Sequence, residues 1–494
     1  MEFGSVNEFL ENKTILVTGA TGYLAKIFVE KILRVQPNVK KLYLLLRARD
    51  ANSAMERFNN EVIGKELFKV LRETHGANLH SFASEKMTPI PGDISCEDLG
   101  IKDSNLKDEM LKEIDVVINF AATTNFDERY DVALGINTLG ALHVLNFAKK
   151  CLNIKMLVHV STAYVCGEDT GIILEKPYLM GRAKKGIMEL NIEEEKKLVQ
   201  EKIGQLKSEN ASEKEITETL KEFGIQRAKL FGWPNTYVFT KAMGEMQLVH
   251  YKQNLPLLII RPTMITSTRK QPFPGWIEGL RTVDSVIGGY AKGRVTCFVA
   301  GPNSILDVIP ADMVVNGILV AMMSREKQIS EEIIYQIGSS MRNPLKFSNI
   351  HDFIYRYFTA NPLINKYGNP VKIMSKGILL GSMASFRLYM ALRFQLPLKV
   401  LQLANTVVLK KYQEEYIVLD KKLKLVMKLV ELYKPYVLFE GIFDDTNTEK
   451  LRMASRSEAI VEEEDEFDFD PTYIDWDDYM MNIHIPGLVK HVIK

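Results

Sequence analysis

The sequence predicts an α/β fold, a Rossmann-like doubly wound parallel sheet followed by a mainly α-helical C-terminal domain. Apolar runs alternate with helical segments up to about residue 340, which is typical of parallel strands buried on both faces. A glycine-rich turn joins the first run to the first helical segment. Residues 371–433 are instead rich in Leu, Met, Lys and Arg at helical spacing, which predicts a helical region.

The predicted strands and helices follow this alternation along the chain. Strands are predicted at Thr14–Thr18, Lys41–Leu46, Lys86–Pro91, Asp115–Phe120, Lys155–Val160 and Leu257–Ile260. Helices are predicted up to about Val35, over 134–151 and from about Asn235. The Lys/Glu-rich stretch over about 182–229 is interpreted as one or two exposed helices inserted into the parent domain, with an outer face that is either solvated or a lid or partner surface.

Two domains are predicted from the change of pattern, one over 1–365 and a helical one over 366–494. Near the end of the chain, Glu462–Asp478 holds ten acids interleaved with four aromatic residues. A freely solvated acidic tail would lack such aromatics, so we expect this segment to dock on the body of the protein.

Composition excludes several classes of protein. With 63 basic and 62 acidic residues, the chain has no overall electrostatic attraction to nucleic acid. Its four cysteines form no CxxC pair and its eight histidines no HxxxH or HExxH spacing, so neither a disulfide framework nor a metal site is expected. The N-terminus lacks a signal or transit pattern, and no stretch has the roughly 18 apolar residues of a membrane span.

The glycine-rich turn has the chemistry of a dinucleotide site. Gly19 permits a tight turn, Gly22 lets a pyrophosphate approach backbone amides, and Ala25 is small enough for close packing of helix and strand. The predicted contacts in this turn are Thr18, Gly19, Thr21, Gly22, Tyr23 and Leu24.

Two further positions bear on the nucleotide. At the end of the second strand, where NAD-specific folds carry an acid, the chain has Arg47, which favours the phosphate of NADPH, although Asp50 is close. Asp93 follows the third strand and is interpreted either as a partner of the adenine amino group or as a turn-forming residue.

Tyr237 and Lys241 are the predicted catalytic pair, and both are also predicted to contact the cofactor. Their spacing of four places phenol and ammonium on one face of a helix. A neighbouring Lys⁺ stabilises a phenolate and makes the phenol a usable acid. Ser161 and Thr162, at the end of the fifth predicted strand, offer hydroxyls that polarise a carbonyl. Together with the dinucleotide turn, these residues predict hydride chemistry.

These residues resemble the extended short-chain dehydrogenase/reductase superfamily and, within it, the plant alcohol-forming fatty acyl-CoA reductases. The resemblance runs from about Leu10 to the end of the chain. Its motifs are Asn38–Arg47, Asp127–Asp131, Trp233–Tyr237, Pro272–Trp276 and Gly441–Asp445. It implies an NADPH-dependent, two-step reduction of a long-chain or very-long-chain acyl-CoA to a primary alcohol, for wax or lipid-polymer biosynthesis.

The resemblance also implies roles for individual residues. Thr162 would be the hydroxyl beside the substrate carbonyl, with Ser161 as the alternative. Ala121, in the loop Asn119–Ala122, would lie along the nicotinamide ribose, Asn137 near the active site, and Pro262 in the turn that lines the nicotinamide. The first domain would be the NADPH-binding reductase domain, and the second would help to build an acyl tunnel.

Three questions stay open at this point. The superfamily motifs also suit a reductase or epimerase of a small carbonyl or sugar, and a non-catalytic NADP-binding scaffold is a further alternative. The basic helical series Leu423, Val426, Met427 and Val430 suits either a membrane surface or core packing. We expect a protein of the cytosol, or one bound peripherally to the cytoplasmic face of the endoplasmic reticulum.

Overall fold

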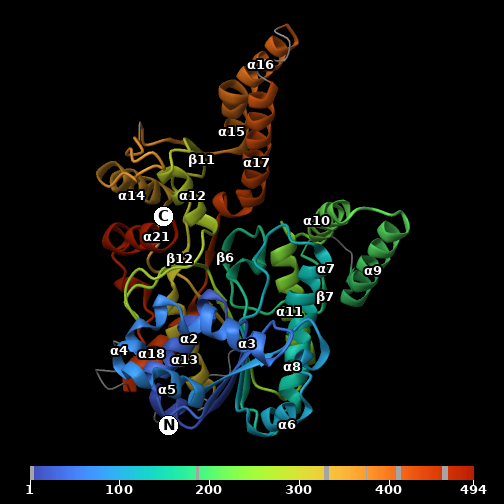
Figure 1. Ribbon diagram of the computed structural model, residues 1–494, viewed down its shortest axis with the longest axis vertical. Helices are drawn as coiled ribbons and strands as arrows, with labels where there is room; N and C mark the ends of the chain where they lie inside the picture. The colour runs from blue at the N-terminus through green and yellow to red at the C-terminus, as the bar shows by residue number, and fades with distance from the viewer. Residues whose placement is uncertain are drawn as a thin grey trace.

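A seven-stranded parallel sheet forms the centre of the protein (Figure 1). The computed structural model describes residues 5–184, 189–326, 333–373, 375–407, 413–458 and 466–493. The strands are β1 (Thr14–Thr18), β2 (Lys41–Leu46), β3 (Met87–Pro91), β4 (Val116–Asn119), β5 (Met156–Val160), β9 (Leu257–Pro262) and β13 (Ile334–Ile337). Their order is β13-β9-β5-β4-β1-β2-β3. The order reverses between β1 and β4, where ligands of such sheets bind at the carboxyl ends.

Helices cover both faces of the sheet, as its apolar strands require. One core holds Ile15 and Val17 of β1, and the other holds Leu16. On the first face lie α1 (Val6–Leu10), α2 (Tyr23–Val35), α3 (Ala51–Phe58), α4 (Lys69–His75), α5 (Leu79–Lys86), α13 (Ala311–Glu326) and α18 (Thr446–Glu458). On the second lie α6 (Ser104–Glu113), α8 (Gly140–Lys150) and α11 (Thr236–Tyr251). The predicted Rossmann-like fold class is therefore confirmed.

The charged insertion forms two helices, α9 (Ile192–Ser208) and α10 (Glu213–Leu230), after the short strands β7 (Gly181–Arg182) and β8 (Glu189–Leu190). Glu195 of α9 is buried, accepting a hydrogen bond from Tyr130 (2.7 Å) and pairing with Arg227 of α10. Tyr130 belongs to α7 (Tyr130–Ala133). These contacts hold the insertion on the body beside α11.

The second half of the chain adds small strand pairs and a group of helices. The pairs are β10 (Met264–Thr266) with β12 (Val308–Pro310), β11 (Cys297–Val299) with β14 (Ile378–Leu380), and β6 (Gly171–Ile173) with β15 (Gly441–Phe443). The helices are α12 (Thr282–Ala291), α14 (Phe347–Ala360), α15 (Met383–Met390), α16 (Leu396–Val407) and α17 (Gln413–Val437). Among the described helices, none is long and apolar enough to cross a bilayer.

The last described segment, 466–493, returns to the sheet domain. Phe467, Phe469 and Tyr479 are buried in the same core as α2 and α13, and Lys31 of α2 donates to the Glu466 carbonyl (2.6 Å). The acidic, aromatic segment thus docks on the body over its described part, while 459–465 lie outside the described residues. The predicted domain boundary near residue 365 stays a prediction. Residues before it and after it contact each other, for example Asn235 and Tyr436.

Candidate active site

The glycine-rich turn lies at the point where the strand order reverses. Gly19 has φ +66°, in the left-handed region, and a Cβ there would lie 2.7 Å from the Ala121 backbone. Only glycine therefore lets the loop after β4 approach the turn so closely. Gly22 is exposed and precedes α2, and among the described residues no side chain caps the first amides of this helix. Such amides attract an anion, so the turn fits a dinucleotide pyrophosphate.

The other predicted residues of the turn face in different directions. Thr18 donates to Asn119 Oδ1 (2.6 Å), and Thr21 is half-buried. The Tyr23 hydroxyl donates to the carbonyls of Thr266 (3.0 Å) and Trp276 (2.9 Å), and Leu24 is buried. The side chains of Tyr23 and Leu24 therefore anchor α2, and their backbone amides are the groups that can meet a cofactor.

The ends of β2 and β3 carry Arg47 and Asp93. Arg47 is exposed, and its carbonyl accepts a hydrogen bond from Arg57 (2.7 Å). Asp50 caps α3, where its carboxylate accepts from the Ser53 amide and hydroxyl (both 2.8 Å). The carboxylate of Asp93 accepts from both the amide and the hydroxyl of Ser95 (2.8 Å each). That turn accounts for Asp93 by itself, so its role toward adenine stays a prediction.

Tyr237 and Thr162 meet near the carboxyl edge of the sheet. Asn235 caps α11 by accepting from the Val238 amide (3.1 Å), which places half-buried Tyr237 in the first turn of that helix. Burial raises the pKa of Tyr237 to about 12, while a hydrogen bond with the Thr162 side chain and the charge of Arg281 act in the opposite direction. The Ser161 hydroxyl is buried and has no partner among the described residues. The structure thus pairs Thr162 with the phenol.

Lys241 is held beneath this pair. Its ammonium donates to the Val160 carbonyl (2.8 Å) and lies 3.2 Å from His159 Nε2. Burial lowers the pKa of Lys241 to about 8. Within the described parts of the chain no hydrogen bond joins Lys241 to Tyr237, and the cation that lowers the pKa of the phenol is Arg281. Direct support of the phenol by Lys241 stays a prediction.

A buried polar chain links Lys241 to the glycine-rich turn. Thr18, Asn119 and His159 stand in register on β1, β4 and β5, with Asn119 Nδ2 lying 3.1 Å from His159 Nδ1. Burial holds the pKa of His159 well below its ordinary value, so the imidazole is neutral. No role for His159 was predicted from the sequence. The sequence does carry a signal for this polar chain, because each of the three apolar strands has a polar residue near its end.

Asn137, Ala121 and Pro262 surround the same edge. Asn137 lies in a π-helical turn, Leu134–Leu139, and bonds the Thr123 backbone (3.0 and 3.1 Å) and Thr240 Oγ1 (3.0 Å). It therefore fastens α11 to the loop after β4. The Ala121 amide donates to Asn119 Oδ1 (3.2 Å). Pro262 ends β9 directly after Arg261, whose guanidinium is buried in an ion pair with Glu245 of α11.

Aromatic residues from the C-terminal half complete the surroundings of Tyr237. Phe126 packs against Tyr237 (ring centroids 6.0 Å apart), Tyr436 (4.7 Å) and Tyr433 (5.5 Å). The Tyr436 hydroxyl accepts from Asn235 Nδ2 (2.8 Å). The end of α17 thus supports the residue that caps α11. Sequence reasoning missed these residues, because no local pattern connects them to a helix about 200 positions earlier.

The described parts of the chain hold no group of three or more His, Cys, Asp or Glu side chains able to hold a metal ion. What they place together is a dinucleotide turn, a phenol, a neighbouring hydroxyl and a buried lysine. Such a set has the chemistry needed to bind a carbonyl oxygen and supply it with a proton.

Comparisons with known proteins agree with this geometry. Residues 17–318 match a family model for an NAD-binding domain described as male sterility protein, and residues 393–494 match a second model with that description. The chain is 57% identical over 494 residues to the alcohol-forming fatty acyl-CoA reductase of Simmondsia chinensis, covering 100% of both chains. It is 57% identical over 488 residues to fatty acyl-CoA reductase 1 of Arabidopsis thaliana, covering 99% of both.

Solved structures show the same fold at low identity. The reductase domain of a nonribosomal peptide synthetase from Mycobacterium tuberculosis aligns with a TM-score of 0.55 at 17% identity, over 97% of this chain and 93% of that one. The terminal reductase domain of the myxalamid pathway aligns at 0.53 and 18%, over 89% and 85%. With the family models and the full-length relatives, the resemblance seen in the sequence is confirmed: the chain belongs to the alcohol-forming fatty acyl-CoA reductases, oxidoreductases that use a nicotinamide cofactor.

Proposed function

We propose that this protein reduces a long-chain or very-long-chain fatty acyl-CoA to a primary alcohol by way of the aldehyde, using NADPH, for wax or lipid-polymer biosynthesis. The observation that carries the proposal is the pairing of Tyr237 with Thr162 at the sheet edge that holds the dinucleotide turn. The acyl-CoA substrate is supported by the names of relatives that match the whole chain.

The residues divide the work of the reaction. A bound reduced nicotinamide supplies one hydride in each of two steps. In the first step, Thr162 and Tyr237 bind the thioester oxygen and polarise the carbonyl for hydride addition. The oxyanion then re-forms the carbonyl as the carbon–sulfur bond breaks, so that coenzyme A leaves as a thiolate, takes a proton from water, and the aldehyde remains. In the second step the same hydroxyls bind the aldehyde oxygen, and Tyr237 gives its proton to the alkoxide, which completes the alcohol.

Two observations support NADPH over NADH. Arg47 is exposed at the end of β2, the position that faces the nucleotide ribose in such sheets. The nearby Asp50 carboxylate is engaged in capping its own helix, an arrangement that also lowers the pKa of Asp50. These observations favour a contact between the Arg47 guanidinium and the 2′-phosphate of NADPH. The Asp50 carboxylate is instead engaged with the N-terminus of its own helix.

A small carbonyl or sugar substrate is less well supported. The superfamily motifs suit it, but the relatives named as fatty acyl-CoA reductases match the chain along its whole length, including the helices beyond the sheet. These helices also meet the catalytic helix directly through Tyr436.

The test is an assay of the purified full chain with each of the two dinucleotides and a series of acyl-CoAs. We expect alcohol as the product, one thiol released and two NADPH oxidised per acyl-CoA, and weaker activity with NADH. Reduction of short aldehydes or sugars without thiol release from any acyl-CoA would overturn the proposal.

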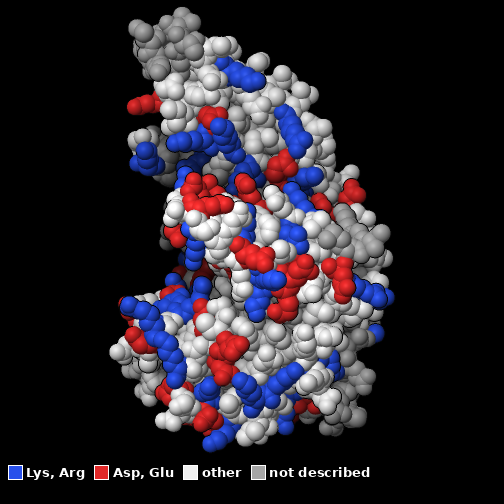
Figure 2. All heavy atoms as spheres, turned by 90° about the vertical axis from the view of Figure 1, so that its right-hand side faces the viewer, with Lys and Arg blue, Asp and Glu red and all other residues white. Residues whose placement is uncertain are grey.

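We also propose that a helical arm attaches the protein peripherally to a membrane. The arm consists of α15, α16 and α17, which project from the body (Figure 1). Large apolar side chains exposed on it are Leu388, Leu392, Phe394, Leu396, Val400, Leu403, Ile417, Val418, Leu419, Leu425, Val426 and Leu429. Basic residues accompany them, and Figure 2 shows basic side chains among uncharged surface over this upper part of the molecule. Exposed apolar surface beside cations suits an anionic lipid interface.

Helix α17 has one face that packs against the rest of the arm and other faces that are exposed. Leu423, Met427 and Val430 pack against a small core that includes Phe386 and Met390, so three of the four residues in the predicted series serve packing. The exposed apolar residues belong to other faces of the same helices. The cytoplasmic face of the endoplasmic reticulum is the location we propose, because acyl-CoA and fatty alcohol both partition into bilayers.

Vesicle sedimentation tests the arm. Leu396→Ser combined with Val400→Ser should lower binding to phosphatidylcholine vesicles that contain phosphatidylserine, and should leave reduction of octanoyl-CoA in solution unchanged. Ile364→Ser, at an equally exposed residue outside the arm, is the control. Equal binding by all three proteins would show that the arm does not hold the membrane.

A further inference from the structure

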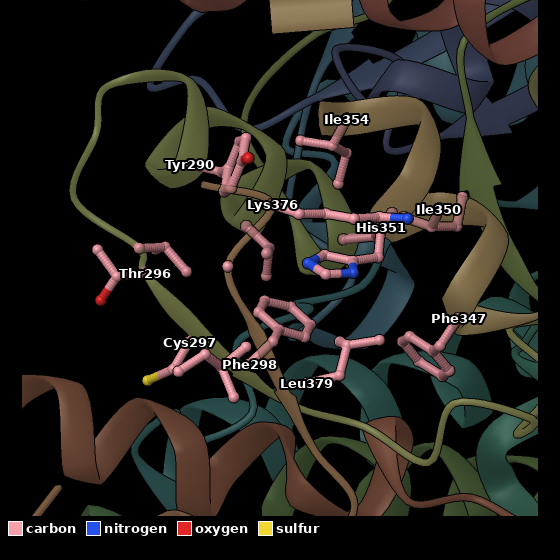
Figure 3. A pocket seen from close by; sticks show the side chains of 15 residues that line it. Tyr290, Thr296, Cys297, Phe298, Phe347, Ile350, His351, Ile354, Lys376 and Leu379 are labelled. Atoms are coloured by element: carbon pink, nitrogen blue, oxygen red, sulfur yellow. The ribbon is translucent and has the colours of Figure 1, made fainter. Parts of the chain in front are cut away.

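An apolar pocket lies between α12, β11, α14 and β14. It is a narrow space, partly open to solvent, whose surface is almost entirely apolar. Figure 3 shows the side chains of these four elements around it. Its apolar lining includes Val283, Val286, Phe298, Ile350, Ile354 and Leu379.

Three polar side chains at this pocket, Tyr290, His351 and Lys376, are already engaged by the protein. The Tyr290 hydroxyl donates to the Ser375 carbonyl (2.9 Å), and Lys376 is paired with Asp352 (2.7 Å). His351 forms a hydrogen bond with the Lys376 backbone, although burial still lowers the pKa of its imidazole. A polar ligand would lose its hydration here and gain few partners, whereas a hydrocarbon loses nothing. The pocket is therefore suited to an alkyl chain.

Helix α12 connects the pocket to the catalytic tyrosine. Arg281, the residue before this helix, acts electrostatically on Tyr237. Tyr433 packs against Phe126 and hydrogen-bonds with Ser285 of α12, and Phe126 packs against Tyr237. From that end, Val283, Val286 and Tyr290 follow one another along one side of the helix. With ten residues at about 1.5 Å each, α12 is about 15 Å long.

We propose that this pocket holds the tail of the acyl substrate and that α12 is the wall along which the chain runs away from Tyr237. The assignment rests on the proposed function, because only an acyl substrate has a tail to place there. The sequence-based expectation was that the C-terminal domain helps to build the tunnel, whereas α12, β11 and α14 all precede residue 365 and only β14 belongs to the later region.

Chain-length preference tests the assignment. Ile354→Phe and Val286→Phe each fill part of the pocket with a ring. Each methylene that is excluded removes a factor of about four in affinity, so kcat/KM for octadecanoyl-CoA should fall at least about tenfold. The value for octanoyl-CoA should change little, because its short tail ends before the blocked part. Thr359→Phe places the same ring at an exposed position of α14 and should behave as wild type.

Direct labelling gives a second readout that does not depend on turnover. An acyl-CoA with a diazirine near the end of its tail, photolysed on the full-length protein, should label peptides from 283–298, 347–354 or 377–379. Labelling elsewhere, together with an unchanged chain-length profile in both Phe variants, would overturn the pocket assignment and leave the proposed function intact. A wild-type protein that releases no thiol from any acyl-CoA would instead overturn the proposed function itself.

Discussion

Single residues of the site differ chiefly in how burial changes their proton affinity. Tyr237 is made a weaker acid by burial, and Thr162 and Arg281 counteract this effect. Lys241 is made easier to deprotonate and His159 is kept neutral. Each of these changes follows from the cost of a charge in a medium of low dielectric constant. Three predictions belong to this scale.

Tyr237→Phe should abolish nearly all reduction and leave NADPH affinity within a few-fold of wild type, since the phenol gives its proton to the substrate oxygen and does not hold the phosphates. Steady-state kinetics and cofactor fluorescence titration measure the two effects separately. More than a tenth of wild-type activity in this variant would show that another group donates the proton.

Lys241 should impose a pH dependence. Burial places its pKa at about 8, so the ammonium is present below this pH and lost above it. His159, which lies against this ammonium, is already neutral and does not titrate in its place. Because Lys241 is also predicted to contact the cofactor, we expect NADPH affinity to weaken as the pH rises through about 8. In Lys241→Met this step should be absent, and a persistent step would assign it to a different group.

Arg47→Ala should weaken NADPH far more than NADH. A charged hydrogen bond to phosphate contributes roughly 1.5–3 kcal/mol, or about ten- to a hundredfold in affinity. Dissociation constants for both dinucleotides decide the matter, and an equal loss for the two would mean that Arg47 does not recognise the phosphate.

At the scale of elements, the position of α11 depends on contacts from distant parts of the chain. Asn137 binds Thr240, Glu245 pairs with Arg261, and Tyr436 of α17 accepts a hydrogen bond from the capping residue Asn235. The catalytic helix is thus held by a π-helical turn, a strand and a C-terminal helix together.

Tyr436→Phe removes only the hydroxyl that supports Asn235. We expect a loss of about 1 kcal/mol in the free energy of unfolding and a lower kcat, because the cap that positions Tyr237 becomes less rigid, with cofactor affinity maintained. Urea unfolding and kinetics measure the two effects. Tyr251→Phe, at the exposed C-terminal end of α11, is the matched control. Identical behaviour of the two variants would contradict a positioning role for Tyr436.

On the scale of the whole molecule, the last described segment packs into the same core as α2. Ile485 and Leu488 are fully buried, and His484 lies between Ser267 and Asp284 at 3.1 Å from each. Residues 484–488 are therefore part of the core in which α2 is packed.

Shortening Ile485 to Ala should lower the free energy of unfolding by about 2–5 kcal/mol through the cavity it leaves. A chain that ends before residue 466 should fail to fold and should bind no NADPH. Chemical denaturation and dye binding report these outcomes. Met453→Ala, at an exposed residue of α18, should be close to wild type. A soluble, NADPH-binding truncated chain would show that the sheet domain folds without its last segment.

The sequence by itself determined six of the seven strands of the central sheet, all but β13, together with the glycine-rich turn and the helix that carries Tyr237 and Lys241. Each of these depends on a local pattern: apolar runs, small residues at a sharp turn, and a spacing of four. Only the tertiary structure decided that Thr18, Asn119 and His159 form one buried chain to Lys241, that Tyr436 supports the catalytic helix, and that an apolar pocket follows α12. Register between strands and packing between distant helices depend on complementary surfaces, which local patterns do not encode.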